Sequence, residues 1–156
     1  MRKFIQRRGF SAAKIFAAGW LIPLLTLWAQ DLGTPVKDLL VIVNVAAKVD
    51  SISEVELNKV LHGRDDRFMT LGIQEQDYKR ILKEFGKTDP SRFEREWIGL
   101  ILSGKRSDRP VHTENVLSLL GIAKKKKDAL IVVNADSLRL KPEDFGVKAI
   151  KIYKKK

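Results

Sequence analysis

The segment DLLVIVNVA, residues 38–46, is a nearly continuous run of β-branched and other apolar residues. Such a run is typical of a strand buried on both faces of a sheet, because helices cover it from both sides. A similar run, DALIVVN, occupies residues 128–134 and predicts a second buried strand. The segment VKAIKIY, residues 147–153, has a lysine among the apolar residues of each face, which favours a strand at the edge of the sheet.

Helical patterns separate the two buried strands. The first begins at Ser53, which with Glu56 has the sequence signature of a capping box, and it ends at Gly63. The following residues, 64–75, have no clean period and predict a loop that can include a short strand. Three more apolar repeats with helical spacing follow, over residues 78–86, 90–104 and 113–121. In the second repeat, the helical spacing of Phe93 and Trp97 beside Leu100 favours core positions over the alternative that they stack on a ligand. Strands interleaved with helices predict a small α/β fold, a mixed sheet flanked by helices.

Composition limits the chemistry that the chain can perform. Its 156 residues correspond to one domain, and no cysteine is present, which excludes a disulfide, a thiolate metal site and a cysteine nucleophile. Two histidines, His62 and His112, are too few for a metal site with three histidine ligands. We interpret His62 as a partly exposed side chain that interacts with the carbonyls at the end of its helix, and we find no partner for His112.

Sequence motifs for catalysis are missing as well. There is no G-x-S-x-G, G-x-G-x-x-G or Walker sequence. The adjacent acids Asp65 and Asp66 are flanked by Arg64 and Arg67, so we expect surface ion pairs there rather than acid–base catalysis. We therefore expect no catalytic residue, no metal site and no cofactor.

The start of the chain predicts export. Residues 1–14 contain five basic and no acidic side chains, and residues 15–30 carry no charge. This is the pattern of a secretory signal peptide, and Pro23 argues against the alternative of an uncleaved membrane anchor. The predicted parts are a signal peptide, a linker and a periplasmic domain, at residues 1–30, 31–37 and 38–156.

Charge argues against nucleic acid as a partner. The whole chain has a net charge of +11, but 25 basic and 19 acidic residues remain without the predicted signal peptide, which is a net charge of +6. Nearly half of the positive charge therefore belongs to the export signal. A basic nucleic-acid binder is the disfavoured alternative, and we expect membrane contact only through the signal segment.

From Asp38 onward, the order of the motifs resembles the periplasmic substrate-binding proteins of phosphate ABC transporters, in a short single-lobed form. The resemblance begins with the strand Leu39–Asn44 and the helix Ser53–Gly63. It continues with the element Phe93–Lys105 around Trp97 and closes with the strand that includes Ala149. It implies a periplasmic-binding-protein-like α/β lobe without catalysis, whose partner is an inorganic oxyanion or an envelope protein.

One part of the family pattern is replaced. The family holds phosphate at a Gly-Ser-Gly-Thr turn, where backbone N–H groups and hydroxyls suit an anion. The comparable stretch, residues 72–77, has two carboxylates and no hydroxyl, which should repel phosphate. The remaining candidates for an anion site are Ser51, Ser53, Arg64 and Arg67, although Ser53 also fits the plain role of a helix cap. The alternative function is a periplasmic protein-interaction module that has no small-molecule ligand.

Overall fold

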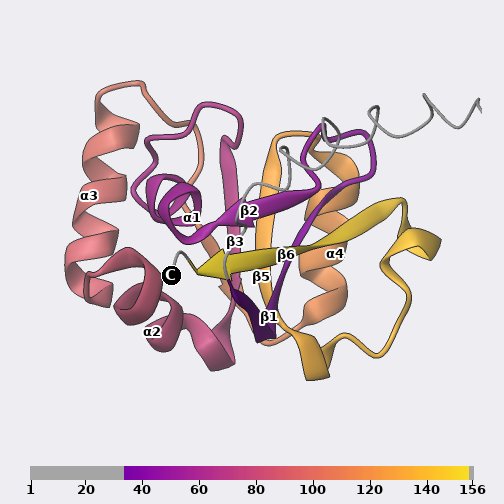
Figure 1. Cartoon of the computed structure of the whole chain (residues 1–156). Helices are drawn as coiled ribbons and strands as arrows, with labels where there is room; N and C mark the ends of the chain where they lie inside the picture. The colour runs from indigo at the N-terminus through magenta and orange to yellow at the C-terminus, as the bar shows by residue number, and fades with distance from the viewer. Residues whose placement is uncertain (1–33, 155–156) are drawn as a thin grey trace, which may run out of the picture. The chain divides into compact units, whose positions relative to one another are not determined.

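The computed structural model describes residues 34–154 (Figure 1). The predicted signal peptide and residues 31–33 of the predicted linker lie outside the described residues. Within residues 34–154, no helix has the length and the hydropathy that a crossing of the membrane requires.

A mixed sheet of six strands forms the centre of the domain, in the order β2-β6-β1-β5-β3-β4. β1 runs antiparallel to both of its neighbours, whereas the other neighbouring strands pair in parallel. The predicted α/β class and mixed sheet are confirmed. The strands are β1 (Thr34–Asn44), β2 (Ser51–Ser53), β3 (Thr70–Gln74), β4 (Val111–Thr113), β5 (Ala129–Asn134) and β6 (Val147–Lys154).

Helices cover both faces of this sheet, as Figure 1 shows. On one face lie α1 (Glu54–Leu61), α2 (Tyr78–Ile81) with its π-helical continuation η2 (Leu82–Gly86), and α3 (Pro90–Leu102). The other face is covered by α4 (Val116–Lys125). Short 3-10 turns complete the connections, namely η1 (Glu75–Asp77), η3 (Ala135–Ser137) and η4 (Pro142–Phe145).

The alternation of side chains along β1 builds the two apolar layers. Leu39, Val41 and Val43 face α1, α2 and α3, whereas Ile42 faces α4, and all four are fully buried. Each such side chain contributes about 1.5–3 kcal/mol when it leaves water. Burial on both faces explains why the sequence of this strand is apolar almost without interruption.

β6 is an interior strand, which corrects the prediction of an edge strand. β1 pairs with it along one side, and β2 pairs with its residues 151–153 along the other. Its lysines reach acids beside the sheet, since Lys148 Nζ lies 2.8 Å from Asp50 Oδ1. The strand that forms the true edge, β2, has only three residues, which is too short for a period to be visible in the sequence.

Two boundaries differ from those that we expected. β1 begins at Thr34, inside the predicted linker, because its first residues pair with the end of β6. α4 begins after Asn115 and continues through Gly121 to Lys125, instead of covering residues 113–121. Two carbonyl groups in the last turn of α4 accept hydrogen bonds from a residue distant in the sequence. Asn44 Nδ2 donates to the carbonyls of Ala123 and Lys124, both at 3.0 Å.

The stretch 72–77, which was compared with the family's anion-binding turn, begins inside the sheet: residues 72–74 end β3, and residues 75–77 form η1. Gly72 lies in the middle of β3 and faces α4. A Cβ atom there would lie 2.5 Å from Cδ1 of Ile131 and 3.1 Å from Cδ2 of Leu119. Glycine is therefore required at this position by the close packing of the helix on the sheet.

Candidate functional site

Ser53, one of the predicted site residues, caps α1. Its Oγ accepts from Glu56 N at 3.2 Å and donates to Glu56 Oε2 at 2.9 Å. Glu56 Oε2 also accepts from Ser53 N at 2.9 Å. The capping box predicted from the sequence is thus confirmed. Ser51 lies two residues earlier, in β2, and its side chain makes no hydrogen bond with the described residues.

Arg67 joins the same cluster from the loop after α1. Its Nη2 donates to Asp65 Oδ2 at 2.7 Å and to Glu56 Oε1 at 3.0 Å, so Glu56 links Ser53 to Arg67. The hydrogen bond from Arg67 lowers the pKa of Asp65 below its ordinary value of 3.8, against the opposing effect of burial. We call Ser53, Glu56, Asp65 and Arg67 the capping cluster. Both of its donor side chains are already engaged by carboxylates, which an oxyanion would have to displace.

Arg64, the fourth predicted residue, lies apart from the capping cluster. It lines a shallow polar groove together with Lys105 and Ser103, and the carboxylates Asp66 and Glu96 line the same groove. Within residues 34–154, neither Arg64 nor Lys105 has an acidic partner at ion-pair distance. The structure therefore brings Ser53 and Arg67 together and leaves Arg64 in a separate place.

The carboxyl ends of β3 and β5 form a closed polar network. Asn134 N donates to Gln74 Oε1 at 2.8 Å, and Asn134 Nδ2 donates to Asp77 Oδ2 at 3.1 Å. Asp77 also accepts from Arg80 Nη2 at 2.7 Å, and Arg80 reaches Asp38. Ligands of open α/β sheets often bind at this edge, but here the polar side chains satisfy one another.

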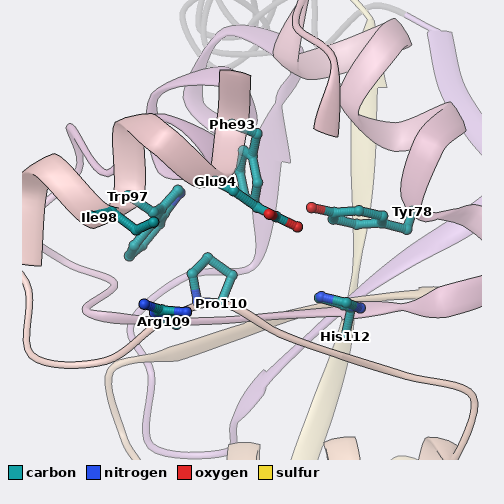
Figure 2. A pocket seen from close by; sticks show the side chains of 8 residues that line it. All are labelled: Tyr78, Phe93, Glu94, Trp97, Ile98, Arg109, Pro110 and His112. Atoms are coloured by element: carbon teal, nitrogen blue, oxygen red, sulfur yellow. The ribbon is translucent and has the colours of Figure 1, made fainter. Parts of the chain in front are cut away.

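A pocket of about 150 Å³ lies between α3 and the extended segment that leads into β4 (Figure 2). α3 contributes one wall and the segment of Arg109 and Pro110 contributes the opposite wall. The side chains that line it are Tyr78, Phe93, Glu94, Trp97, Ile98, Arg109, Pro110 and His112. Asp89 positions the α3 wall, because its carboxylate caps the helix by accepting from Arg92 N at 3.0 Å.

Two aromatic side chains of α3 combine packing with pocket lining. Phe93 and Trp97 are four residues apart, and they are 1% and 2% exposed, which confirms the prediction that they belong to the core. Trp97 Nε1 donates to the carbonyl of Leu61 at 2.8 Å, so that its polar atom is satisfied and only apolar ring surface remains for the pocket. The pocket therefore has rigid aromatic walls.

The hydroxyl of Tyr78 is the unusual polar group of this pocket. Tyr78 is 5% exposed, and its Oη is buried without a hydrogen-bond partner among residues 34–154. Burial, together with the negative charges of Glu94 and Glu75, raises the pKa of this hydroxyl to about 12, so that it is neutral at pH 7. In Figure 2 the hydroxyl points toward the carboxylate of Glu94. An unpaired buried hydroxyl is costly, and most such groups in proteins have a partner.

His112 completes the end of the pocket beside Tyr78. Its ring stacks on that of Tyr78, with the ring centroids 4.8 Å apart and the planes 15° apart. Its Nδ1 lies 2.6 Å from Oε2 of Glu75, a partner 37 residues away that sequence reasoning did not find. The parallel register that pairs Ile73 with His112 brings these two residues to the same edge of the sheet.

The other histidine has a structural position. The ring of His62 lies with Nδ1 2.6 Å from Glu96 Oε2 and Nε2 2.8 Å from the carbonyl of Gly86. The ring thus joins α1 to α3 and η2. We had expected it to interact with the carbonyls of its own helix instead, and that expectation is wrong. Both ring nitrogens are therefore engaged by oxygen atoms of neighbouring elements.

The pocket has charged and polar groups that can bind a ligand. Two of its charges, Glu94 and Arg109, have no ion-pair partner within residues 34–154, and the Tyr78 hydroxyl can donate or accept. In the same part of the chain, no group of three or more acidic or histidine side chains could hold a metal ion. The arrangement can therefore hold a small polar molecule against an aromatic wall.

Comparison of the sequence with protein families and with curated proteins found no match. The resemblance to phosphate-binding proteins therefore stays a prediction from the motifs.

Proposed function

We propose that this chain is an exported, non-catalytic binding domain, related in plan to the single-lobed substrate-binding proteins. Its ligand site is the pocket between α3 and β4 rather than the capping cluster. The observation that supports this choice is the buried Tyr78 hydroxyl beside the carboxylate of Glu94, neither of which has a partner in the described part of the chain. A ligand in this pocket that forms hydrogen bonds with the Tyr78 hydroxyl and the Glu94 carboxylate would satisfy both groups.

Phosphate is a poor candidate for the capping cluster. Its two donor side chains, Ser53 and Arg67, are held by Glu56 and Asp65. Of the predicted anion-binding residues, Arg64 lies elsewhere, in the polar groove with Lys105. Oxyanion binding in that groove is the second candidate function, because these two cations line one concave surface and have no acidic partner at ion-pair distance within residues 34–154.

Titration of the purified protein by NMR tests both candidates. Probes of four chemical classes are added separately: inorganic phosphate, a carboxylate, a sugar and an alkylamine. We expect saturable shifts of the Trp97 indole resonance with at least one organic probe. Phosphate shifts that disappear in Arg64→Gln, and persist in the matched variant Arg139→Gln, would support the groove instead. A protein that binds none of the four probes contradicts both sites, and it favours the protein-interaction module.

We also propose that residues 1–30 direct export to the periplasm, since a basic start is followed by an uncharged apolar run. A fusion of residues 1–37 to alkaline phosphatase should be active, because this enzyme folds only outside the cytoplasm. A matched fusion in which the five basic residues are changed to glutamine should be inactive. If neither fusion is active, the proposal of export is wrong.

A further inference from the structure

The two charges of the pocket that have no ion-pair partner in the described part of the chain have opposite signs and lie on opposite walls. Glu94 comes from α3 and lies beside the Tyr78 hydroxyl, whereas Arg109 comes from the segment before β4 and lies near Trp97 and Ile98 (Figure 2). Both are exposed at the surface of the chain, where water can solvate them. A ligand with two matching charges would gain an ion pair at each end.

The end of the pocket beside Tyr78 is suited to a cation. The carboxylate of Glu94 lies beside the Tyr78 hydroxyl, and it would repel an anion bound there (Figure 2). Glu75, which contacts His112 Nδ1, adds negative charge near Tyr78. The aromatic rings of Phe93 and Trp97 line the pocket, and the face of an aromatic ring attracts a cation. The group that fits must also donate hydrogen bonds, since Glu94 accepts only and the Tyr78 oxygen has lone pairs without a donor.

A primary ammonium meets all of these requirements. It has three N–H donors, which suffice for Glu94 and for Tyr78 Oη, and its charge offsets that of the carboxylate. A neutral hydroxyl can donate only one hydrogen bond and leaves the negative charge uncompensated. A guanidinium is planar and larger, and a pocket of about 150 Å³ leaves little room for it beside a carbon chain.

We propose that this pocket binds a short amino acid whose ammonium lies between Tyr78 and Glu94 and whose carboxylate pairs with Arg109. The carbon chain between the two charged ends packs against Trp97 and Pro110. The proposal rests on the proposed function, because it names the ligand class of the same pocket. Arg109 excludes a diamine, since a second ammonium would meet a like charge.

Four probes of similar length separate the contributions: aminovalerate, pentylamine, pentanoate and cadaverine. We expect aminovalerate to bind most tightly by isothermal titration. Pentylamine should bind about tenfold more weakly, because it lacks the carboxylate for Arg109. Pentanoate and cadaverine should bind more weakly still. A lysine that is blocked at its α-amino and α-carboxyl groups represents the lysine side chain of a partner protein. If it binds more tightly than aminovalerate, the proposal of a free amino acid as the ligand is wrong.

Variants assign each end of the ligand. Glu94→Gln should weaken aminovalerate binding at least about tenfold, and Arg109→Gln should weaken it while leaving pentylamine unchanged. Glu143→Gln is the matched control, since Glu143 is an exposed glutamate in η4 that does not line the pocket. Tyr78→Phe should weaken binding about threefold to tenfold without any loss of stability, a combination that a structural role of the hydroxyl does not produce.

The outcomes distinguish the ligand class from the site. If pentanoate or a sugar shifts the Trp97 indole resonance and no amine does, the amino-acid ligand is wrong and the binding pocket stands. If amines bind equally well to Glu94→Gln and to the unmodified protein, the assignment of the ammonium is wrong. If no probe perturbs the pocket, both this inference and the proposed function fail.

Discussion

The capping cluster and the pocket contain similar side chains in opposite states. In the capping cluster, Arg67 and Ser53 donate to the carboxylates of Asp65 and Glu56 over distances of 2.7–3.2 Å. In the pocket, Glu94 and Arg109 have no ion-pair partner within residues 34–154, and the Tyr78 hydroxyl is buried and unpaired. Polar groups that satisfy one another stabilise a loop, whereas polar groups left without partners are available to a ligand.

The density of polar residues in the sequence is therefore a poor guide to the site. The segment around Asp65 has four charged side chains in a row, which suggests a binding loop. In the structure, however, Asp65 and Arg67 bind each other and stabilise the conformation of this loop. The pocket residues come from three separate segments, and no single motif joins them. The difference between the two regions leads to four predictions.

The largest expected effect concerns the support beneath the capping cluster. Arg106 has a side chain that is 1% exposed, and its Nη2 donates to the carbonyls of Gly63 and Asp65 at 2.7 and 3.1 Å. Arg106→Ala leaves both carbonyls without this donor and should lower the free energy of unfolding by about 3 kcal/mol. Urea denaturation measures the change. The exposed neighbour Lys105 is the matched control, since Lys105→Ala should have an effect within about 0.5 kcal/mol.

Asp65→Asn should lower the free energy of unfolding by about 1–2 kcal/mol at neutral pH, because the charge-assisted hydrogen bonds with Arg67 are lost. The pKa of Asp65 is lowered in the folded protein, so its stabilising effect is complete above the ordinary value of 3.8 and is lost as the pH falls below it. The difference between the two proteins should therefore shrink in acid. Urea denaturation at several pH values measures it, and a difference that grows below pH 3.8 would contradict the assignment.

Ser53→Ala should lower the free energy of unfolding by about 1 kcal/mol, since the cap of α1 is lost. Ser51 is a matched control two residues away, because its side chain makes no hydrogen bond within the described residues. Thermal unfolding by circular dichroism should show a decrease in Tm for the first variant and no change for Ser51→Ala. Equal decreases for both variants would show that the capping box does not carry the effect.

Tyr78→Phe should have the smallest effect and the opposite sign. Removal of a buried hydroxyl that has no partner should leave the free energy of unfolding unchanged or raise it by up to about 1 kcal/mol. The same thermal unfolding measurement applies, and Tyr153→Phe is a control for the loss of a half-buried hydroxyl elsewhere. A loss of more than about 1 kcal/mol would reveal a partner for the Tyr78 hydroxyl and would remove the main support for the pocket.

The core of the fold could be predicted from the sequence. The two buried strands, the capping box at Ser53 and the apolar face of α3 follow from patterns within a few residues. The short strands β2 and β4 could not be predicted, since three residues do not show a period. The interior place of β6 was missed for the same reason, because its neighbour β2 was not visible.

Less of the candidate site could be predicted. Phe93 and Trp97 were expected in the core, and they lie there, but no sequence signal showed that they also line a pocket. Tyr78, Glu94 and Arg109 were not candidates. His112 had no expected partner, because Glu75 lies 37 residues earlier in the chain.

The fold class, the buried strands and the helix cap can be inferred from the sequence alone, because periodicity and capping depend on residues that are near neighbours along the chain. Which charged groups are paired and which line a pocket became known from the three-dimensional packing. Pairing depends on strand register and helix packing, and these bring residues from distant segments within hydrogen-bond distance or hold them just beyond it.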